Sequence, residues 1–257
     1  MSKVLYRLKN IQKSFGEKKV LDISYLEISK GKFVSIVGYS GSGKSTLLNI
    51  LGLLDKPDFD KRAKLEIEIN STKFEVSFDN KGKWLIKDGE KKVNTSNFRY
   101  KNIGFVFQDN YLPPHLKIDN LFKTFYDFKE INQKMKDVSL PEKFLDKYPF
   151  ELSGGEVQRI TILFAIAKNP LILLTDEPTS NLDYHIGKSV LKLFQSWLEK
   201  GNNDKRDKRT VIMVSHHLHQ VCEFSDIIIL LKDGKVIDTI DNSKKEITPD
   251  ILTKKMI

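Results

Sequence analysis

Residues 38–45 form the segment with the clearest chemical potential, a glycine-rich stretch that ends in Gly43, Lys44 and Ser45. Glycines let a backbone curl until successive N–H groups point at one anion, and a helix that begins at the curl adds the positive end of its dipole. Lys44 offers a mobile cation to the outer phosphates of a nucleotide, and the hydroxyl of Ser45 can bind Mg²⁺. The spacing therefore predicts a nucleotide phosphate site rather than a plain flexible loop.

The elements on either side of this segment agree with that interpretation. Residues 33–37 are a short run of apolar and branched residues, which predicts a strand, and residues 46–51 have helical character. A strand, a loop and a helix in this order are the context that the phosphate-binding pattern requires.

Two adjacent carboxylates, Asp176 and Glu177, follow the apolar run at residues 171–174. A run of this length predicts a buried strand, and the strand ends of an α/β sheet border its ligand site. Such an acidic pair is common on its own, so its meaning depends on the phosphate loop. With that loop present, Asp176 is suited to the Mg²⁺ shell, and Glu177 is suited to activating the attacking water as a general base.

A second Ser/Gly turn, made of Ser153, Gly154, Gly155 and Glu156, opens a helical stretch at residues 157–167. Backbone N–H groups and a hydroxyl at such a helix start can again face an anion. The whole run at residues 152–159, together with the phosphate loop and the acidic pair, resembles the signature of the ATP-binding cassette family. Over nearly its whole length, the chain resembles the nucleotide-binding subunit of an ABC transporter.

This resemblance implies ATP and Mg²⁺ as cofactors and ATP hydrolysis as the reaction. Phe15 matches the aromatic residue that stacks on adenine, Gln108 matches the glutamine at Mg²⁺ and the attacking water, and His216 matches the histidine at the γ-phosphate. The implied catalytic residues are Lys44, Gln108, Glu177 and His216, and the implied metal ligands are Ser45, Gln108 and Asp176. The implied nucleotide contacts are Phe15, Val20, Gly38, Tyr39, Ser40, Gly41, Ser42, Gly43, Lys44, Ser45, Thr46, Ser153, Gly154, Gly155, Glu156 and Asp183.

The fold that the resemblance implies is α/β, with a P-loop NTPase core and a mainly parallel sheet, an antiparallel β lobe and a short helical signature subdomain. We expect a single domain over residues 1–257, with the β lobe near 1–30 and 58–101, the helical subdomain near 109–168 and the core in the remainder. The pattern of apolar residues itself predicts strands at 20–28 and 211–214 and helices at 121–136 and 186–198. It also predicts an exposed hairpin lobe within 55–101, with a turn at 79–82.

The resemblance also implies partners. In this family two chains sandwich two ATP molecules, so that the signature of one chain covers the phosphates held by the other, and residues 181–183 join the two sites. The region of Gln108 relays the nucleotide state to a separate membrane permease. Residues 48–57 and 102–108 look most like the lipoprotein-release, macrolide-export and cell-division group, which implies export or extraction of an envelope substrate such as lipoprotein, peptide or drug.

The sequence departs from the pattern of that group at three places. The stretch between Pro57 and Gln108 is longer than usual, and the stretch between Gln108 and Ser153 is shorter. Phe164 stands where relatives usually have an arginine. The two changes in length bear on the identity of the permease, because the resemblance implies that the permease docks against the helical lobe. Phe164 implies a difference in local packing.

Composition places the chain among globular proteins. It has 257 residues, of which 40% are hydrophobic and 30% charged, and its apolar runs are far shorter than the roughly 20 residues of a membrane helix. Residues 1–10 lack the continuous apolar segment of a signal peptide. We therefore expect a cytoplasmic chain that is peripheral on the inner face of the cell membrane. Cys222 is the single cysteine, and its apolar neighbours predict burial.

Three other functions are compatible with parts of the sequence. The formal charge of +9 favours anionic partners and is compatible with a nucleic-acid-associated ATPase. However, residues 109–152 are too short for the coiled coil of chromosome-type relatives, and one phosphate loop contrasts with the two of translation-type relatives, so no nucleic acid is expected. A regulatory scaffold of the cell-division type is another alternative. His216, His217 and His219 lie close together in sequence, but no distant ligand set completes a zinc site.

Overall fold

Short apolar runs of the sequence become a mainly parallel sheet in the computed structural model, which describes residues 4–58, 60, 62–78, 84–109, 112–202 and 208–256. Within these residues the sheet has six strands in the order β12, β11, β3, β10, β9 and β8. All neighbours are parallel except β12, which pairs antiparallel with β11. The strands are β3 (Phe33–Val37), β8 (Ile103–Val106), β9 (Ile172–Asp176), β10 (Thr210–Val214), β11 (Ile227–Lys232) and β12 (Lys235–Asp241).

A second sheet, wholly antiparallel among the described strands, has the order β2, β1, β4, β5, β6 and β7. It joins two segments that lie far apart in the sequence, because β1 pairs with both β2 and β4. The strands are β1 (Val4–Phe15), β2 (Lys18–Ser29), β4 (Lys64–Ile69), β5 (Thr72–Phe78), β6 (Trp84–Asp88) and β7 (Lys91–Val93).

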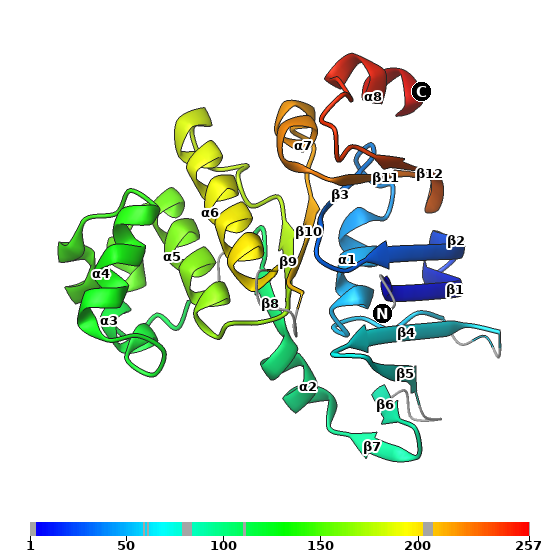
Figure 1. Ribbon diagram of the computed structural model, residues 1–257, viewed down its shortest axis with the longest axis horizontal. Helices are drawn as coiled ribbons and strands as arrows, with labels where there is room; N and C mark the ends of the chain where they lie inside the picture. Colours follow the sequence, from blue (N-terminus) through cyan, green and yellow to red (C-terminus); the bar gives the residue numbers. More distant parts are fainter. Residues whose placement is uncertain are drawn as a thin grey trace.

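Side chains of a strand alternate between the two faces of a sheet, and this alternation divides the apolar residues into two cores. In β3, Val34 and Ile36 join the core between the two sheets, whereas Phe33 and Val37 join the core beneath the helices. Helix α1 (Lys44–Leu51) lies between the sheets and buries Leu47, Leu48, Ile50 and Leu51 in the first core. The helix after the phosphate loop is therefore held from both sides (Figure 1).

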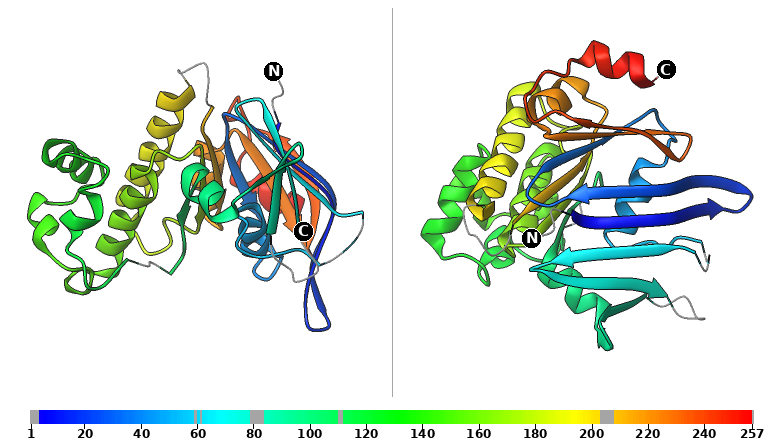
Figure 2. Two further views of the ribbon diagram at one scale, coloured as in Figure 1. Left: turned by 90° about the horizontal axis from the view of Figure 1, so that it is seen from below. Right: turned by 45° about the vertical axis from the view of Figure 1, so that its right-hand side comes forward.

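Helix α2 (Thr95–Asn102) contacts β6 and β8 and adds Phe98 to the core between the sheets, whereas other helices lie on the opposite face of the parallel sheet. Figures 1 and 2 show α3 to α6 gathered on the side away from the antiparallel sheet. The helices other than α1 have the following bounds: α2 (Thr95–Asn102), α3 (Ile118–Phe122), α4 (Phe128–Asp137), α5 (Gly154–Ala167), α6 (Tyr184–Asn202), α7 (Leu218–Phe224) and α8 (Pro249–Met256). Short 3-10 turns lie at Glu142–Asp146 and Pro149–Glu151. None of the helices in the described residues is long and apolar enough to cross a membrane.

The prediction of one helix across residues 121–136 is wrong. The chain forms two helices instead, because α3 ends at Phe122 and Asp127 starts α4 as its N-cap. The Asp127 carboxylate accepts the N–H of Glu130 at 2.8 Å, and the Glu130 carboxylate accepts the N–H of Asp127 at 3.4 Å. This reciprocal cap is a helix-start signal that the apolar spacing does not reveal.

The expectation of an exposed hairpin lobe within residues 55–101 needs a correction. Strands β4 and β5 do form a hairpin, but β4 pairs with β1 and extends the antiparallel sheet, so Leu65, Ile67 and Ile69 are buried. Helix α2 also lies within this segment and was not expected. The turn predicted at residues 79–82 lies outside the described residues.

Cys222 is buried, as expected.

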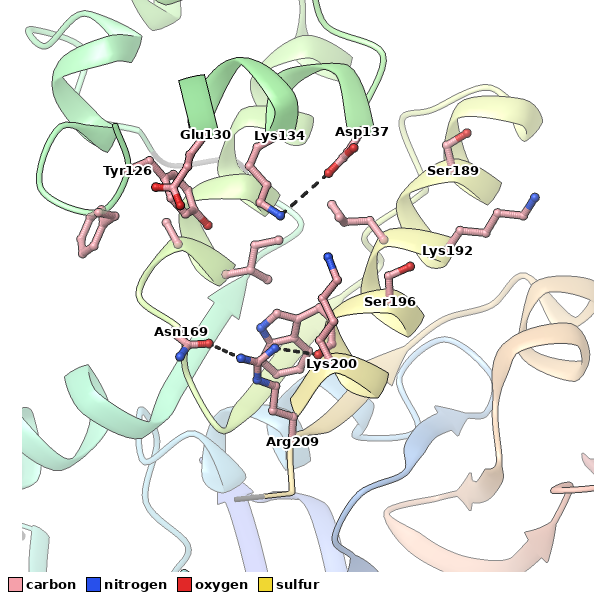
Figure 3. Close-up of a pocket in the computed structure, with 15 residues that line it drawn as sticks. Tyr126, Glu130, Lys134, Asp137, Asn169, Ser189, Lys192, Ser196, Lys200 and Arg209 are labelled. Carbon is pink, nitrogen blue, oxygen red and sulfur yellow. Dashed lines mark hydrogen bonds and ion pairs between the residues drawn. The ribbon is translucent and has the colours of Figure 1, made fainter. Parts of the chain in front are cut away.

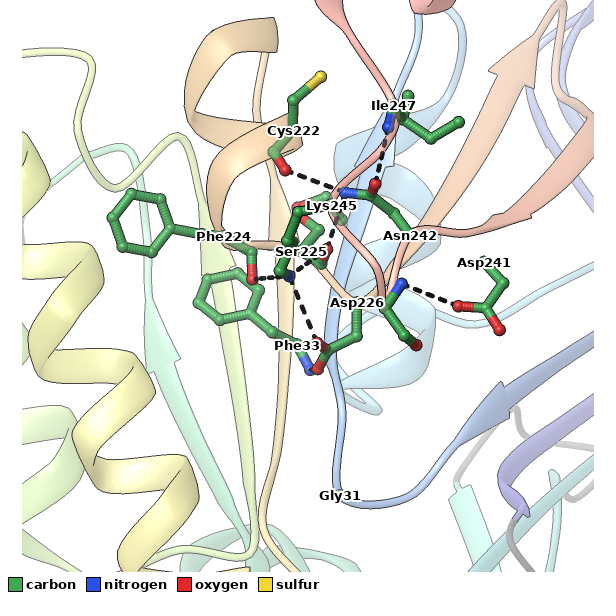
Figure 4. Close-up of polar contacts among 12 residues, drawn as sticks. Gly31, Phe33, Cys222, Phe224, Ser225, Asp226, Asp241, Asn242, Lys245 and Ile247 are labelled. Atoms are coloured by element: carbon green, nitrogen blue, oxygen red, sulfur yellow. Dashed lines mark hydrogen bonds and ion pairs between the residues drawn. The ribbon is translucent and has the colours of Figure 1, made fainter.

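The segment after β12 is tied to the sheet by a buried asparagine (Figure 4). Asn242 is 1% exposed, and its side-chain N–H groups donate to the carbonyls of Cys222 at 2.9 Å and Ser225 at 3.0 Å. Its side-chain oxygen accepts the N–H of Ile247 at 3.1 Å. This amide therefore links the end of α7 to the chain that leads into α8.

We expect Asn242→Ala to destabilise the fold, because the Cys222 carbonyl and the Ile247 N–H would lose their side-chain partner, whereas the Ser225 carbonyl would keep the Lys245 ammonium at 2.6 Å. At about 1 kcal/mol or more for each orphaned group, the loss should be about 2–4 kcal/mol of unfolding free energy, measurable by urea titration. The control is Asn97→Ala in α2, at an exposed position whose side chain has no hydrogen bond among the described residues. Equal unfolding free energies for the two variants would contradict the assigned role.

Candidate nucleotide site

A cleft of about 450 Å³ opens where β3, β9 and β10 reach their carboxyl ends. It collects residues from the phosphate loop, α1, the acidic pair and the loop after β10. Its lining consists of Lys18, Val20, Gly38, Ser40, Gly41, Gly43, Lys44, Ser45, Thr46, Gln108, Asp176, Glu177, Val214 and His216. The structure therefore brings together all four residues to which catalysis was assigned and all three assigned as metal ligands.

The phosphate loop has a shape that side chains would prevent. A Cβ on Gly38 would lie 2.1 Å from the carbonyl oxygen of Leu231 and 2.6 Å from the hydroxyl of Ser42. Gly43 has a φ of 97° and also packs against the carbonyl of Val20. Both positions therefore need glycine, the first for close packing and the second for a left-handed backbone as well. The loop packs against β2 at Val20 and against β11 at Leu231, and these contacts fix its curved backbone.

Lys44 folds back over this loop. Its ammonium group donates to the carbonyl oxygens of Gly38 at 3.0 Å and Tyr39 at 2.9 Å. Burial lowers the pKa of Lys44, and the nearby Glu177 and Asp176 partly oppose that shift. The cation is thus held at the mouth of the loop by neutral acceptors, which bind an ammonium group less strongly than phosphate oxygens would.

Asp176 ends β9 and lies half-buried beside the loop. Burial raises its pKa, while a hydrogen bond from the Ser45 hydroxyl and the charge of Lys44 act in the opposite direction. The carboxylate atom Oδ1 is buried and has no partner among the described residues. A carboxylate, a hydroxyl and the amide of Gln108 in one cleft are the hard oxygen donors that Mg²⁺ prefers, so these residues fit that ion.

Glu177 and His216 form a close pair across the cleft. The Oε2 atom of Glu177 lies 2.9 Å from Nδ1 of His216 and accepts the backbone N–H of His216 at 3.3 Å. Glu177 has a φ of 49°, an unusual backbone conformation for a residue with a side chain, and its N–H donates to the carbonyl of Val214 at 3.0 Å. A strained backbone conformation of this kind persists only where surrounding contacts hold it in place, and such conformations are concentrated at functional sites.

Gln158 is a residue of the site region that the sequence analysis missed. It lies on α5, is fully buried, and donates through Nε2 to the carbonyl of Pro178 at 2.6 Å and that of Glu177 at 3.5 Å. It therefore connects the signature helix to the turn that carries Glu177. The sequence signal was its place in the run 152–159. Lys18, which also lines the cleft, is the first residue of β2 and carried no sequence signal beyond its charge.

Several predicted nucleotide contacts lie outside the cleft within one chain. Phe15 is 55% exposed at the end of β1, with the ammonium of Lys13 5.0 Å from its ring centre. Tyr39 lines a smaller neighbouring cavity, and Ser42 is buried behind the loop. Five further predicted contacts are also absent from the lining of the cleft. They are the signature residues Ser153, Gly154, Gly155 and Glu156, together with Asp183.

The signature turn is open on its outer side. Ser153 and Gly154 are exposed, and nothing lies within 4 Å of a Cβ built on Gly154. The Glu156 carboxylate accepts the N–H of Ser153 at 2.7 Å and is held there with a lowered pKa. Asp183 accepts the N–H of Ile186 at 3.0 Å and caps the start of α6. The turn is therefore formed and accessible, but it faces away from the cleft of its own chain.

We expect Asp176→Asn to raise the stability of the protein without nucleotide. The folded-state pKa of Asp176 is raised above 3.8, so its contribution to stability is greatest below that pH and is lost as pH rises through the folded pKa. At neutral pH a neutral amide should therefore gain about 0.5–2 kcal/mol, as other stabilising changes at functional sites do.

The test compares thermal unfolding midpoints at pH 7 and near pH 4, with Asp88→Asn as the control on the exposed edge of β6. The gain for Asp176→Asn should shrink at the lower pH, and the control should change little at either. A lower midpoint for Asp176→Asn at pH 7 would contradict this account.

Comparisons with known proteins agree with this geometry. The family model described as ABC transporter matches residues 21–180. The lipoprotein-releasing system ATP-binding protein LolD of Aquifex aeolicus is 36% identical, over 93% of this chain and 99% of that protein. The macrolide export ATP-binding/permease protein MacB of Campylobacter fetus is also 36% identical, over 96% of this chain and 38% of that longer protein.

A solved structure shows the same fold with products bound. The ATP-binding cassette MJ0796 of Methanocaldococcus jannaschii, in a dimeric post-hydrolysis state with ADP and Pi, superposes with a TM-score of 0.70. It is 33% identical, and the match covers 93% of this chain and 99% of that one. The names of the relatives agree with the lipoprotein-release and macrolide-export group that the sequence resembles. Since the family model covers more than half of the chain, the chain belongs to the ABC transporter family and is one of its ATP-binding, ATP-hydrolysing members.

Proposed function

We propose that this chain is the ATP-hydrolysing subunit that drives a separate membrane permease, and that it is peripheral on the cytoplasmic face of the membrane through that permease. The observation that carries the proposal is the convergence of Lys44, Asp176, Glu177 and His216 on one cleft. The named relatives support transport of an envelope substrate such as lipoprotein, peptide or drug, because one belongs to a lipoprotein-releasing system and another to macrolide export.

The phosphates of ATP would occupy the curl of residues 38–45. Lys44 would exchange the carbonyls of Gly38 and Tyr39 for β- and γ-phosphate oxygens, a charged pairing that is stronger than the neutral one it replaces. Ser45 and Asp176 would hold Mg²⁺ with help from Gln108, and the ion supplies positive charge to the transferring phosphate. The unpartnered Oδ1 of Asp176 is the atom available for that contact.

Glu177 would take a proton from the attacking water. Its carboxylate already accepts the backbone N–H of His216 at 3.3 Å and lies 2.9 Å from Nδ1 of the same residue, and these two contacts hold it at the mouth of the cleft. A positioned base of this kind acts through geometry, since it must reach the water and the phosphorus together. His216 would then serve both neighbours, as the group that orients Glu177 and as a donor near the γ-phosphate.

A second copy of the chain would complete the site. The signature turn is exposed on its own chain and does not line the cleft that holds Lys44. In a two-fold arrangement, the N–H groups at the start of α5 would cover the phosphates bound by the partner copy. The dimeric state of the solved cassette bound to ADP and Pi supports this arrangement.

We expect Glu177→Gln to reduce phosphate release by about 10²–10⁴-fold, which is the usual contribution of a general base, while ATP binding is retained. Turnover is measured as phosphate released under saturating ATP and Mg²⁺, and binding by equilibrium titration with a fluorescent ATP analogue. The control is Glu199→Gln at an exposed position of α6, which should keep full turnover. Undiminished phosphate release by Glu177→Gln would refute the base assignment.

The dimer is tested by placing a charge in the open signature turn. In the Glu177→Gln background, ATP should give a dimer on size-exclusion chromatography, and Gly154→Asp should reduce it by about tenfold or more, because the new carboxylate would meet the partner's phosphates. The fold should tolerate the change, since a Cβ at Gly154 meets nothing within 4 Å and an acid suits a helix start. Gly154→Ala is the matched neutral control. Equal dimer formation by both variants would argue against the sandwich.

A further inference from the structure

A second and larger cavity, of about 690 Å³, lies among α4, α5 and α6 (Figure 3). It shares no lining residue with the nucleotide cleft. Two of its residues, Asn169 and Arg209, precede β9 and β10, so the cavity lies at the amino ends of these parallel strands. The nucleotide cleft lies at their carboxyl ends. The cavity is therefore a separate feature on the other edge of the same sheet.

Positive charge dominates the lining of this cavity. The lining holds four cations, Lys134, Lys192, Lys200 and Arg209, and two acids, Glu130 and Asp137. Among the described residues, Lys134 is the one cation of the four with a carboxylate partner. Its Nζ atom lies 3.9 Å from Oδ2 of Asp137, which is long for an ion pair. Figure 3 shows Lys134 and Lys200 directed into the cavity from α4 and α6. An excess of unpaired cations around a concave space attracts an anion.

Arg209 is held in place without an acid. It donates to the backbone carbonyl of Trp197 at 2.7 Å and to the side-chain oxygen of Asn169, both of which are neutral. Its guanidinium lies 5.0 Å from the ring centre of Trp197. Gly201 leaves room for this arrangement, because a Cβ there would lie 2.2 Å from Cδ of Arg209. The positive charge is therefore fixed by α6 and left without a counter-ion among the described residues.

The wall beside these cations is aromatic. Trp197 is 7% exposed and lines the cavity together with Phe125 and Tyr126. The indole N–H of Trp197 has no acceptor in the described part of the chain, although such a buried donor normally finds one. A ligand that suits this lining has an apolar ring to cover the aromatic wall and oxygen atoms to accept from the cations.

We propose that this cavity binds a soluble organic phosphate that carries an aromatic body. The aromatic body packs against Trp197 and Phe125, and the phosphate is bound by the cations of α4 and α6. Charge complementarity selects the phosphate, and the apolar wall selects an organic phosphate over the inorganic ion. The site is distinct from the ATP cleft, so nucleotide bound at Lys44 does not occupy it.

The sequence offers a direct reporter for this proposal. The chain has two tryptophans, so Trp84→Phe leaves Trp197 as the one indole. In this background, phenyl phosphate should change the tryptophan fluorescence in a saturable way. Inorganic phosphate and phenol, each of which has half of the required chemistry, should bind about tenfold more weakly or worse, a difference of about 1.4 kcal/mol. Lys44→Ala, a change confined to the nucleotide cleft, should leave the phenyl phosphate titration unchanged.

Charge reversal at the rim tests the location. Lys200→Glu and Lys192→Glu, both at exposed positions of α6, should each weaken phenyl phosphate binding by about tenfold. The control is Lys129→Glu, the same charge change at an exposed position of α4 that does not line the cavity, and screening should keep its effect within about twofold. Far-UV circular dichroism confirms that each variant is folded.

Four results would overturn the proposal. They are the absence of a saturable fluorescence change, equal binding of phenyl phosphate and inorganic phosphate, loss of phenyl phosphate binding in Lys44→Ala, and equal losses for the rim variants and the Lys129→Glu control.

Discussion

The parallel pairing of β3, β10 and β9 is the constraint on which the nucleotide site depends. Val214 is paired with Ile36 on one side and with Asp176 on the other, so the three strands end in register. The pairing continues one residue further, because Glu177 donates its N–H to the carbonyl of Val214 at 3.0 Å. The residues that follow the strands therefore emerge side by side. The phosphate loop, the acidic pair and His216 are neighbours because the backbone hydrogen bonds of one sheet bring them to the same edge.

That convergence brings an ammonium group and carboxylates together in a partly buried site, where burial disfavours their charged forms. Burial moves the pKa of Lys44 down and the pKa of Asp176 up, so each group is shifted toward its neutral form. The two groups partly compensate each other. Otherwise Lys44 donates to neutral carbonyl oxygens, and Oδ1 of Asp176 has no hydrogen-bond donor among the described residues. Phosphates and a divalent cation would supply the missing partners. The site is thus arranged for the charge of its ligand more than for its own stability.

The sequence allowed prediction of the groups whose chemistry is encoded locally. The phosphate loop, Asp176 with Glu177, and the signature turn each depend on a spacing of a few residues, and each lies in the expected strand or helix context. Contacts between distant segments were not predictable in the same way. Gln158 contacts Pro178 because its helix packs against the sheet. The lining of the second cavity likewise brings together Lys134 and Arg209, which lie far apart in the sequence. The division of α3 from α4 was missed because apolar spacing continues across the break, while the cap at Asp127 overrides it.

Helix α5 relates the two edges of the sheet to each other. Its first residues form the open signature turn, Gln158 in its second turn is bonded to the segment that carries Glu177, and Ile166 and Ala167 at its end line the second cavity. With 14 residues it spans about 21 Å, and a helix of that length moves largely as one body. A ligand that changes how the end of α5 sits against α4 and α6 would therefore also displace its start, where the partner's phosphates would bind. Any coupling between the two sites would therefore run through α5, the element that contributes residues to both.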